Sequence, residues 1–257
     1  MDLSIGFVSI LIWLIALVNG SLGLVVLFGN KNRVSRAFFN LLVWVSVWLI
    51  AQGLFYAANF EFAQYVSKSL YYWGGVLAAA FFYFVLVFPE GEKQKKWIIW
   101  SLILSQIFLA ILYIFTNSIV YGAFSVAGLS RWGWHFGPLS LLFDFFFYLF
   151  WGGGIAILFK KFLQTKKGEP KHLQLKYMVI AMIIAITSPS FMNILLPRFG
   201  IFSLNWIGAV SVLNFVIVIA YSIIKYNQMD VKAVAAEVLV LVMVIVLFAN
   251  IFTSATL

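Results

Sequence analysis

A single carboxylate interrupts the otherwise apolar stretch Leu139–Phe159, at Asp144. An ionised carboxylate in such surroundings needs a cationic partner, hydrogen bonds or water. Asp144 could therefore act as the counter-ion of a cationic ligand, or as a group that titrates with the pH. Tyr148 follows one helical turn later and could donate a hydrogen bond to it. Alternatively, Asp144 simply reaches toward lipid headgroups or Arg131, and both interpretations stay open.

The segment Thr116–Pro138 carries a second set of candidate residues, Arg131, Trp134 and His135. Its aromatic rings supply contact area and its basic groups supply polarity, so the segment could cap a cavity and contact a ligand. A segment lying flat at the membrane interface would have the same composition, and this alternative also stays open. No metal site is predicted, because no second histidine or cysteine is expected on the same side of the membrane as His135.

Two further apolar stretches contain polar or helix-bending residues. Pro189 removes one helical hydrogen bond and bends its helix, which makes it a candidate hinge, although such kinks are often fixed architecture. Asn193 lies one turn further on, and Asn214 lies on a face of small and polar residues in the next stretch. Both asparagines are candidate ligand-binding residues, but a face of this kind also marks helix–helix contact.

Catalytic chemistry is not predicted. The sequence has no His-Glu-x-x-His zinc motif, no phosphate-binding glycine loop and no Gly-x-Ser-x-Gly nucleophile elbow. Cysteine is absent, so there is no thiolate nucleophile and no cysteine metal ligand. The two histidines, His135 and His172, are expected on opposite sides of the membrane. We therefore predict a chain that is not an enzyme by itself and that needs no cofactor.

Membrane-spanning helices must position all these residues. The 257 residues are 64% hydrophobic and only 10% charged, whereas soluble domains contain about 25% charged residues. A helix of about 20 apolar residues crosses the hydrocarbon core. Eight segments meet this requirement and predict an all-α integral membrane protein, namely Ile5–Phe28, Ala37–Ala57, Leu70–Phe88, Trp97–Phe115, Leu139–Phe159, Tyr177–Leu196, Leu204–Ile224 and Ala233–Ala255.

The basic residues alternate along the chain in a way that predicts orientation. Most of the 17 lysines and arginines follow the first, third, fifth and seventh segments, in 31–36, 93–96, 160–176 and 225–232. Basic residues in short loops stay in the cytoplasm, so the N-terminus is predicted outside. The net charge of +9 is explained by this orientation and does not predict nucleic-acid binding. Aromatic residues near segment ends, among them Tyr71 and Trp73, are predicted to anchor in the headgroup zone.

A junction peptide at the end of the seventh segment adds a family resemblance. The stretch Ala220–Val231, with Lys225-Tyr226 and Met229-Asp230-Val231, resembles the closing segment of the N-terminal seven-transmembrane region of bacterial sensor histidine kinases. Asn30–Arg33 leading to Arg36–Phe39, Phe88-Pro89, the pair Pro189 and Asn193, and Gly208 are similar as well. The resemblance covers about residues 1–232. It implies a seven-helix sensory bundle at 1–232, followed by an eighth helix at 233–257.

The resemblance also implies a function. The bundle would be the sensory input module of a two-component kinase in the bacterial cytoplasmic membrane, responding to a small or lipid-like signal. Lys225, Tyr226 and Asp230 would relay the helix rearrangement, and a cytoplasmic region absent from this chain would form a homodimer. Since eight spans leave the C-terminus outside, we expect Leu257 to be a truncation point that a ninth span originally followed. A small-molecule transporter and a stand-alone receptor remain the alternatives.

Overall fold

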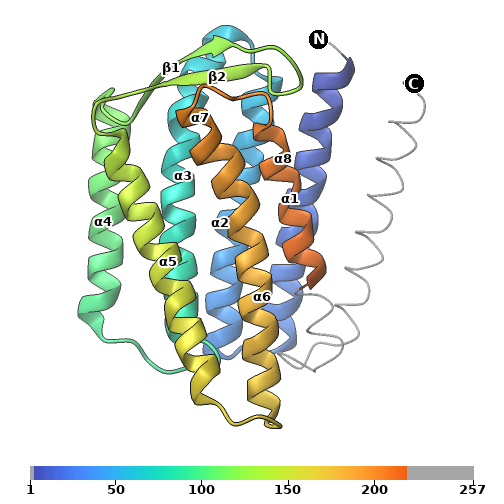
Figure 1. Ribbon diagram of the computed structural model, residues 1–257, viewed down its shortest axis with the longest axis vertical. Coiled ribbons are helices and arrows are strands. Elements are labelled where there is room, and N and C mark those ends of the chain that lie inside the picture. Colours follow the sequence, from blue (N-terminus) through green and yellow to red (C-terminus); the bar gives the residue numbers. More distant parts are fainter. Residues whose placement is uncertain (1–2, 219–257) are drawn as a thin grey trace.

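The computed structural model describes residues 3–218 as a bundle of long helices topped by a β-hairpin (Figure 1). Six helices are long and apolar enough to cross a membrane, and they correspond to the first six predicted segments. The elements are α1 Leu3–Gly29, α2 Arg33–Ala57, α3 Phe60–Val87, α4 Lys96–Phe115, β1 Val120–Ser125, β2 Trp132–Phe136, α5 Ser140–Gln164, α6 Pro170–Ser190, the π-helix η1 Phe191–Leu195, α7 Leu196–Arg198 and α8 Asn205–Val210.

The seventh predicted segment begins as a helix near its expected start. An apolar helical stretch covers Asn205–Val218, with α8 as its first part. The remainder of that segment and the eighth segment, Ala233–Ala255, lie outside the described residues. The count of seven spans plus one therefore stays a prediction.

Helix α3 is the central element of the described bundle, and α4 is peripheral. In the most apolar stretch of α3, 67% of the residues are buried, compared with 11% in α4. Helix α3 packs against α2, α4 and α5, and α1 packs along α2. The broad side-chain face that α4 leaves uncovered is apolar, as expected for a helix in contact with lipid.

Asparagine caps explain where two of the helices begin. The side-chain oxygen of Asn32 accepts a hydrogen bond from the backbone N–H of Ser35 at 2.8 Å, and that of Asn59 accepts one from Phe62 at 2.9 Å. Such caps satisfy donors that the first helical turn leaves free. The predicted start of the third segment at Leu70 was wrong as a helix boundary, because the cap at Asn59 starts α3 at Phe60.

The segment Thr116–Pro138 is not a loop but contains an antiparallel hairpin of β1 and β2, so the fold is not purely helical. A register shift lies between Tyr121 and Ala123, at Gly122, whose φ of 59° favours glycine. The side chain of Gln64 holds this irregular point. Its Nε2 donates to the carbonyl of Ala123 at 2.9 Å, and its Oε1 accepts from the N–H of Ala123 at 2.8 Å. Helix α3 thereby fixes the hairpin across one end of the bundle, called the hairpin end below.

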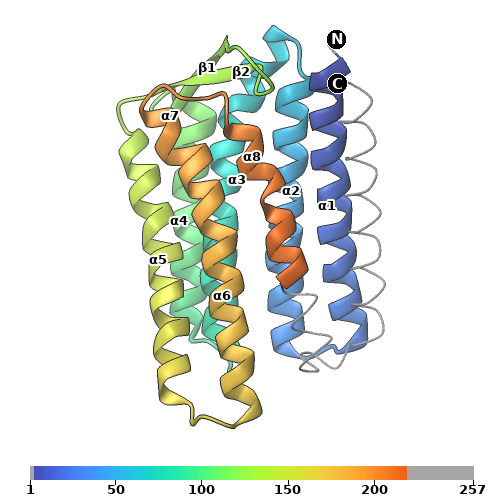
Figure 2. The same ribbon diagram turned by 45° about the vertical axis from the view of Figure 1, so that its right-hand side comes forward.

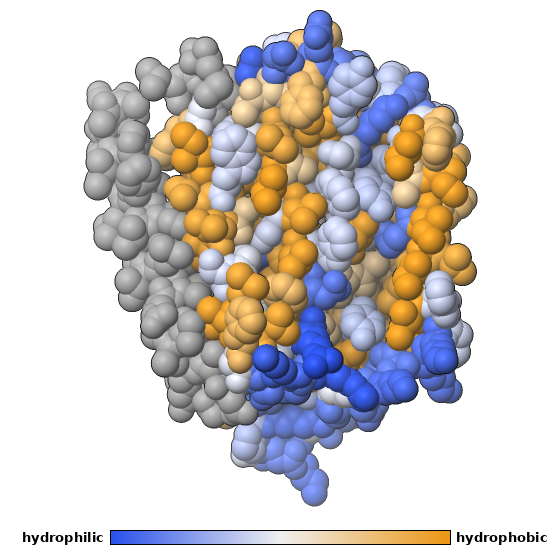
Figure 3. Space-filling model, turned by 180° about the vertical axis from the view of Figure 1, so that it is seen from behind, coloured by the Kyte–Doolittle hydropathy of each residue, from blue (hydrophilic) through white to orange (hydrophobic). Residues whose placement is uncertain are grey.

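The opposite end, called the basic end, carries the loops between α1 and α2, α3 and α4, and α5 and α6 (Figure 1). Figure 3 shows hydrophobic side chains over the middle of one face of the molecule and hydrophilic side chains gathered along its lower edge. Three of the predicted basic clusters, 31–36, 93–96 and 160–176, therefore share one end. The fourth, 225–232, lies outside the described residues.

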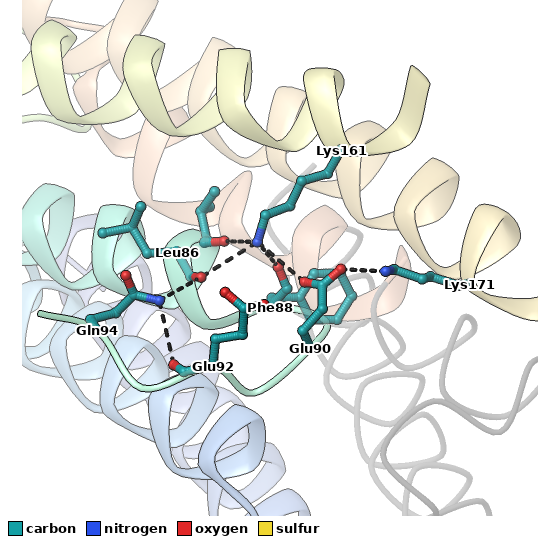
Figure 4. A network of polar contacts seen from close by, with 8 residues as sticks. Leu86, Phe88, Glu90, Glu92, Gln94, Lys161 and Lys171 are labelled. Atoms are coloured by element: carbon teal, nitrogen blue, oxygen red, sulfur yellow. Dashed lines mark hydrogen bonds and ion pairs between the residues drawn. The ribbon is translucent and has the colours of Figure 1, made fainter. Parts of the chain in front are cut away.

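Lys161, in the last turn of α5, ties this helix to the end of α3 and to the loop that follows α3 (Figure 4). Its Nζ donates to the carbonyls of Val85 at 3.1 Å, Leu86 at 3.4 Å and Phe88, and so caps the C-terminus of α3. Glu90 pairs with Lys161 at 3.4 Å and also with Lys171 from the start of α6. Specific contacts thus hold the basic end together despite its positive charge.

Candidate ligand cavity

A cavity of about 80 Å³ lies inside the bundle, between α2, α3, α5, α6 with η1, and the apolar stretch that begins with α8. Trp134 of β2 contributes to its wall from the hairpin end, and the other walls are mostly aliphatic and aromatic. The aromatic part of the wall consists of Trp48, Tyr71, Phe143, Phe147, Trp151 and Phe215. An apolar cavity with a few polar groups in its wall is the usual form of a small-molecule site.

A chain of hydrogen bonds runs along one side of this cavity. Nε2 of Gln52 donates to the hydroxyl of Tyr56 at 2.7 Å and to Oδ1 of Asn193 at 3.2 Å. Nε1 of Trp134 donates to the hydroxyl of Tyr71 at 3.1 Å, and that hydroxyl donates to the carbonyl of Asn193 at 3.4 Å. The network therefore connects α2, α3, β2 and η1 at a single residue, Asn193.

The local structure around Pro189 explains why Asn193 can occupy this position. Helix α6 continues through Pro189 to Ser190, and the next five residues form the π-helix η1. Proline cannot donate the helical hydrogen bond, and a π-turn accommodates an altered backbone register. Gly208 then lets α8 approach closely, because a Cβ at this position would overlap Nδ2 of Asn193. Figure 2 shows α8 lying beside α6, in agreement with their contacts.

Asp144 belongs to a separate ion pair at the hairpin end. Nε and Nη2 of Arg198 donate to its Oδ2 at 3.0 Å and 2.7 Å, and Nη1 of Arg198 donates to Oγ of Ser140 at 2.8 Å. The guanidinium also lies 3.9 Å from the ring centroid of Phe136. The suggested pairing of Asp144 with Arg131 was therefore wrong: the end of the sixth apolar helix, at α7, brings Arg198 to it. The need for a cationic ligand as counter-ion is correspondingly reduced.

The other predicted site residues separate into two groups. Trp134, Pro189 and Asn193 line the cavity together. Arg131, Tyr148, His135 and Asn214 do not belong to that lining. Side chains alternate along a strand, so His135 points away from Trp134 and is exposed, stacked on Tyr121 at 5.3 Å.

Three of these four residues have simple placements of their own. Arg131 lies at the turn of the hairpin, 4.9 Å from the ring of Trp132. Tyr148 is 44% exposed and, in the described part of the chain, has no hydrogen bond to Asp144. Asn214 is exposed as well. The proposed relay residues Lys225, Tyr226 and Asp230 lie outside the described residues.

The sequence-based reasoning missed Gln52, Tyr71, Ser190 and Arg198. Gln52 is one of two amide side chains in the apolar segment Ala37–Ala57, and a polar side chain in such a segment is a recognisable signal for a buried polar contact. Tyr71 was predicted to anchor in the headgroup zone, but α3 begins at Phe60, so this residue lies about three turns into the helix and is buried. Nothing in the sequence indicated that Arg198 would return to α5.

Metal binding has no support in residues 3–218, where no group of three histidine, aspartate or glutamate side chains could hold an ion. The cavity lining is mostly apolar with a few hydrogen-bonding groups, which suits recognition by shape and hydrogen bonding. Because residues from several helices line the cavity, a bound molecule would affect how these helices pack against one another.

Comparison with known proteins agrees with a bundle of spanning helices. The chain matches a family model described as the N-terminal 7TM region of histidine kinase, over residues 11–232. No curated protein and no solved structure gives a match. The match begins within α1, covers every later described helix and includes the junction peptide Ala220–Val231. The chain is a multi-pass membrane protein that belongs to the family of N-terminal seven-transmembrane sensory regions of histidine kinases.

Proposed function

We propose that the chain detects a small or lipid-like signal in the cavity and passes a helix rearrangement to a cytoplasmic kinase region. The observation that carries this proposal is the cavity itself, whose wall includes Pro189, Ser190 and Asn193 at the junction of α6 and η1. A bound molecule would contact the part of α6 where the regular helical hydrogen bonding is already interrupted. A bound signal would then need to break few further helical hydrogen bonds to change the bend of α6.

The relay would run from the cavity into the seventh span. Asn193 contacts Gly208 of α8, and Val212 and Phe215 line the cavity further along the same stretch. A molecule that favours one packing of α6 against this stretch shifts a two-state equilibrium by its differential affinity for the two states. Lys225, Tyr226 and Asp230 follow in the sequence and would carry the displacement to the kinase region.

The proposed setting is the bacterial cytoplasmic membrane, with the basic end in the cytoplasm and the hairpin end outside. A signal would then reach the cavity from the outer half of the bilayer or from the hairpin side. We expect the complete kinase to be a homodimer through its cytoplasmic region. The other expected partner is the lipid bilayer, which surrounds the spanning helices.

A cavity-filling substitution tests this function. Ala185 lines the cavity, so Ala185→Phe in the full-length kinase places a ring inside it. Overpacking of this kind typically costs about 1–3 kcal/mol, and when this cost falls on one of the two packings, it shifts their equilibrium about 5- to 150-fold. We expect a change of more than about fivefold in basal autophosphorylation in membrane vesicles.

The matched control is Ala156→Phe, at an exposed position of α5. It adds the same ring on the outside of the bundle and should leave autophosphorylation unchanged. If Ala185→Phe inserts and accumulates normally, yet its autophosphorylation equals that of the wild type, the cavity does not control the kinase.

A further inference from the structure

Three buried polar groups in side chains that line the cavity have no hydrogen-bond partner within the described chain. They are Oγ of Ser190, Nδ2 of Asn193 and Nε1 of Trp151, in side chains that are 8%, 9% and 5% exposed. Buried polar groups are nearly always hydrogen-bonded, because leaving one unpaired is unfavourable. Nδ2 of Asn193 packs against Gly208, and the indole of Trp151 stacks on Phe81 with ring centroids 3.9 Å apart. Among the three groups, the hydroxyl of Ser190 is the one that can both donate a hydrogen bond to an occupant and accept one from it.

The cavity offers no charge to an occupant. Its described lining contains no lysine, arginine, aspartate or glutamate. The nearby carboxylate Asp144 and guanidinium Arg198 are already paired with each other at 2.7 Å. An ion brought into the cavity would lose its hydration without gaining a counter-charge, which is strongly unfavourable.

The size and surface of the cavity favour a short apolar chain. Its volume of about 80 Å³ is about half of the roughly 150 Å³ in which an engineered apolar cavity binds benzene. Phe143, Phe147 and Trp151 form one side of it, and Leu77 of α3 contributes to another. A chain with one terminal oxygen could contact these rings while its oxygen reaches Ser190.

We infer that the cavity binds an uncharged aliphatic molecule that carries one hydrogen-bonding oxygen, as in a short alcohol, and that Ser190 bonds this oxygen. That this molecule is the signal rests on the proposed function. That it binds in the cavity rests on the cavity alone. It replaces the cationic ligand that Asp144 suggested. The molecule is recognised by its lack of charge, by the shape of its chain and by its polar contact with Ser190.

Photolabelling of the full-length protein in nanodiscs tests the inference. The probe is a short primary alcohol with a diazirine in its chain, and labelled peptides are mapped by mass spectrometry. We expect labelling within 182–194 or 70–77, both of which border the cavity. Unlabelled alcohol of the same length should protect these peptides, and the matching alkyl trimethylammonium and alkyl sulfonate should protect more than about tenfold less well. Equal protection by either permanently charged compound overturns the inference, and so does labelling confined to lipid-facing positions.

Two serine variants isolate the polar contact. Ser190→Ala removes the unpartnered hydroxyl and should weaken protection by the alcohol about three- to tenfold, the range of one net hydrogen bond. Because the lost group has no partner, the thermal stability of the unliganded variant should not fall. Ser211→Ala is the control: Oγ of Ser211 is buried and donates to the carbonyl of Gly208 at 2.7 Å, outside the cavity lining. It should lower stability and leave protection unchanged, and the opposite pattern contradicts the role of Ser190.

The two proposals fail in distinguishable ways. Protection by the alcohol together with unchanged autophosphorylation of Ala185→Phe would keep the site and reject the sensory function. Altered autophosphorylation together with protection by the charged compounds would keep the sensory function and reject the neutral ligand.

Discussion

Replacing the two residues of the ion pair between Asp144 and Arg198, singly and together, separates its energy from that of its surroundings. The variants are Asp144→Asn, Arg198→Gln and the double substitution. Arg198 makes two hydrogen bonds to Asp144 and one to Ser140. The side chains of Arg198 and Asp144 are 20% and 16% exposed, so water screens their charges only partly.

The magnitude follows from this geometry. Removing one partner of a fully buried ion pair costs about 3–5 kcal/mol, and hydrogen bonds to charged groups contribute about 1.5–3 kcal/mol. Because both side chains keep some exposure at the end of the bundle, we expect about 2 kcal/mol for Asp144→Asn. Arg198→Gln should lose about 3 kcal/mol, because the bond to Ser140 and the contact with Phe136 disappear as well. The double variant should lose about 3 kcal/mol rather than the sum, which gives a coupling of about 2 kcal/mol.

Steric trapping or reversible unfolding in bicelles at neutral pH measures these free energies. Arg131→Gln is the control, since Arg131 stacks on Trp132 without an ion pair to a carboxylate in the described chain, and it should change stability by less than about 0.5 kcal/mol. A coupling below about 0.5 kcal/mol would refute the reasoning, because the pair would then be screened as at an open surface. Equal losses for Arg131→Gln and Arg198→Gln would refute it too.

Two other predictions concern packing and pH. Gly53→Ala should lower the free energy of unfolding by about 1–3 kcal/mol, because the added Cβ would overlap the indole of Trp13. Gly20→Ala is the control and should be tolerated, because its added Cβ would lie 3.5 Å from Oγ of Ser46. Thermal unfolding of both variants measures the difference. Burial acts to raise the pKa of Glu90, but the hydrogen bond from Lys171, a backbone hydrogen bond and the charges of Lys161 and Lys171 outweigh it and hold that pKa below the ordinary glutamate value. A lowered pKa stabilises the folded loop at neutral pH, and this stabilisation is lost as the pH falls from the ordinary glutamate value through the lowered one. Amide exchange at 88–92 should therefore show an acid-induced step in the wild type and no such step in Glu90→Gln.

The number of spans in the described part and their common basic end could be predicted from the sequence, because both depend on composition over long windows. The helix ends could not be predicted as well. The start of α3 depends on one hydrogen bond between Asn59 and Phe62, and the hydrophobicity of Phe60–Ser69 is too low to indicate a span. This error moved Tyr71 from the cavity wall to the headgroup zone.

The candidate site was predicted only in part, because its contacts join residues distant in the chain. Asn193 and Trp134 were recognised as unusual residues, and the cavity joins them. Gln52 reaches Asn193 across more than half of the chain, and Arg198 reaches Asp144 from a different helix. Sequence spacing carries no information on such pairs. The strand alternation that separates Trp134 from His135 could be recognised only once the segment was known to be a hairpin.

The orientation of the bundle is the claim on which the sensory account depends, and thiol labelling in intact cells measures it directly. The chain has no cysteine, so single cysteines can be placed without background at Lys93 and Lys166 of the basic end and at Ser125 of the hairpin. A membrane-impermeant maleimide should modify the hairpin position in intact cells and the two basic-end positions only after permeabilisation. Modification of Lys93→Cys and Lys166→Cys in intact cells, with Ser125→Cys protected, would contradict the account.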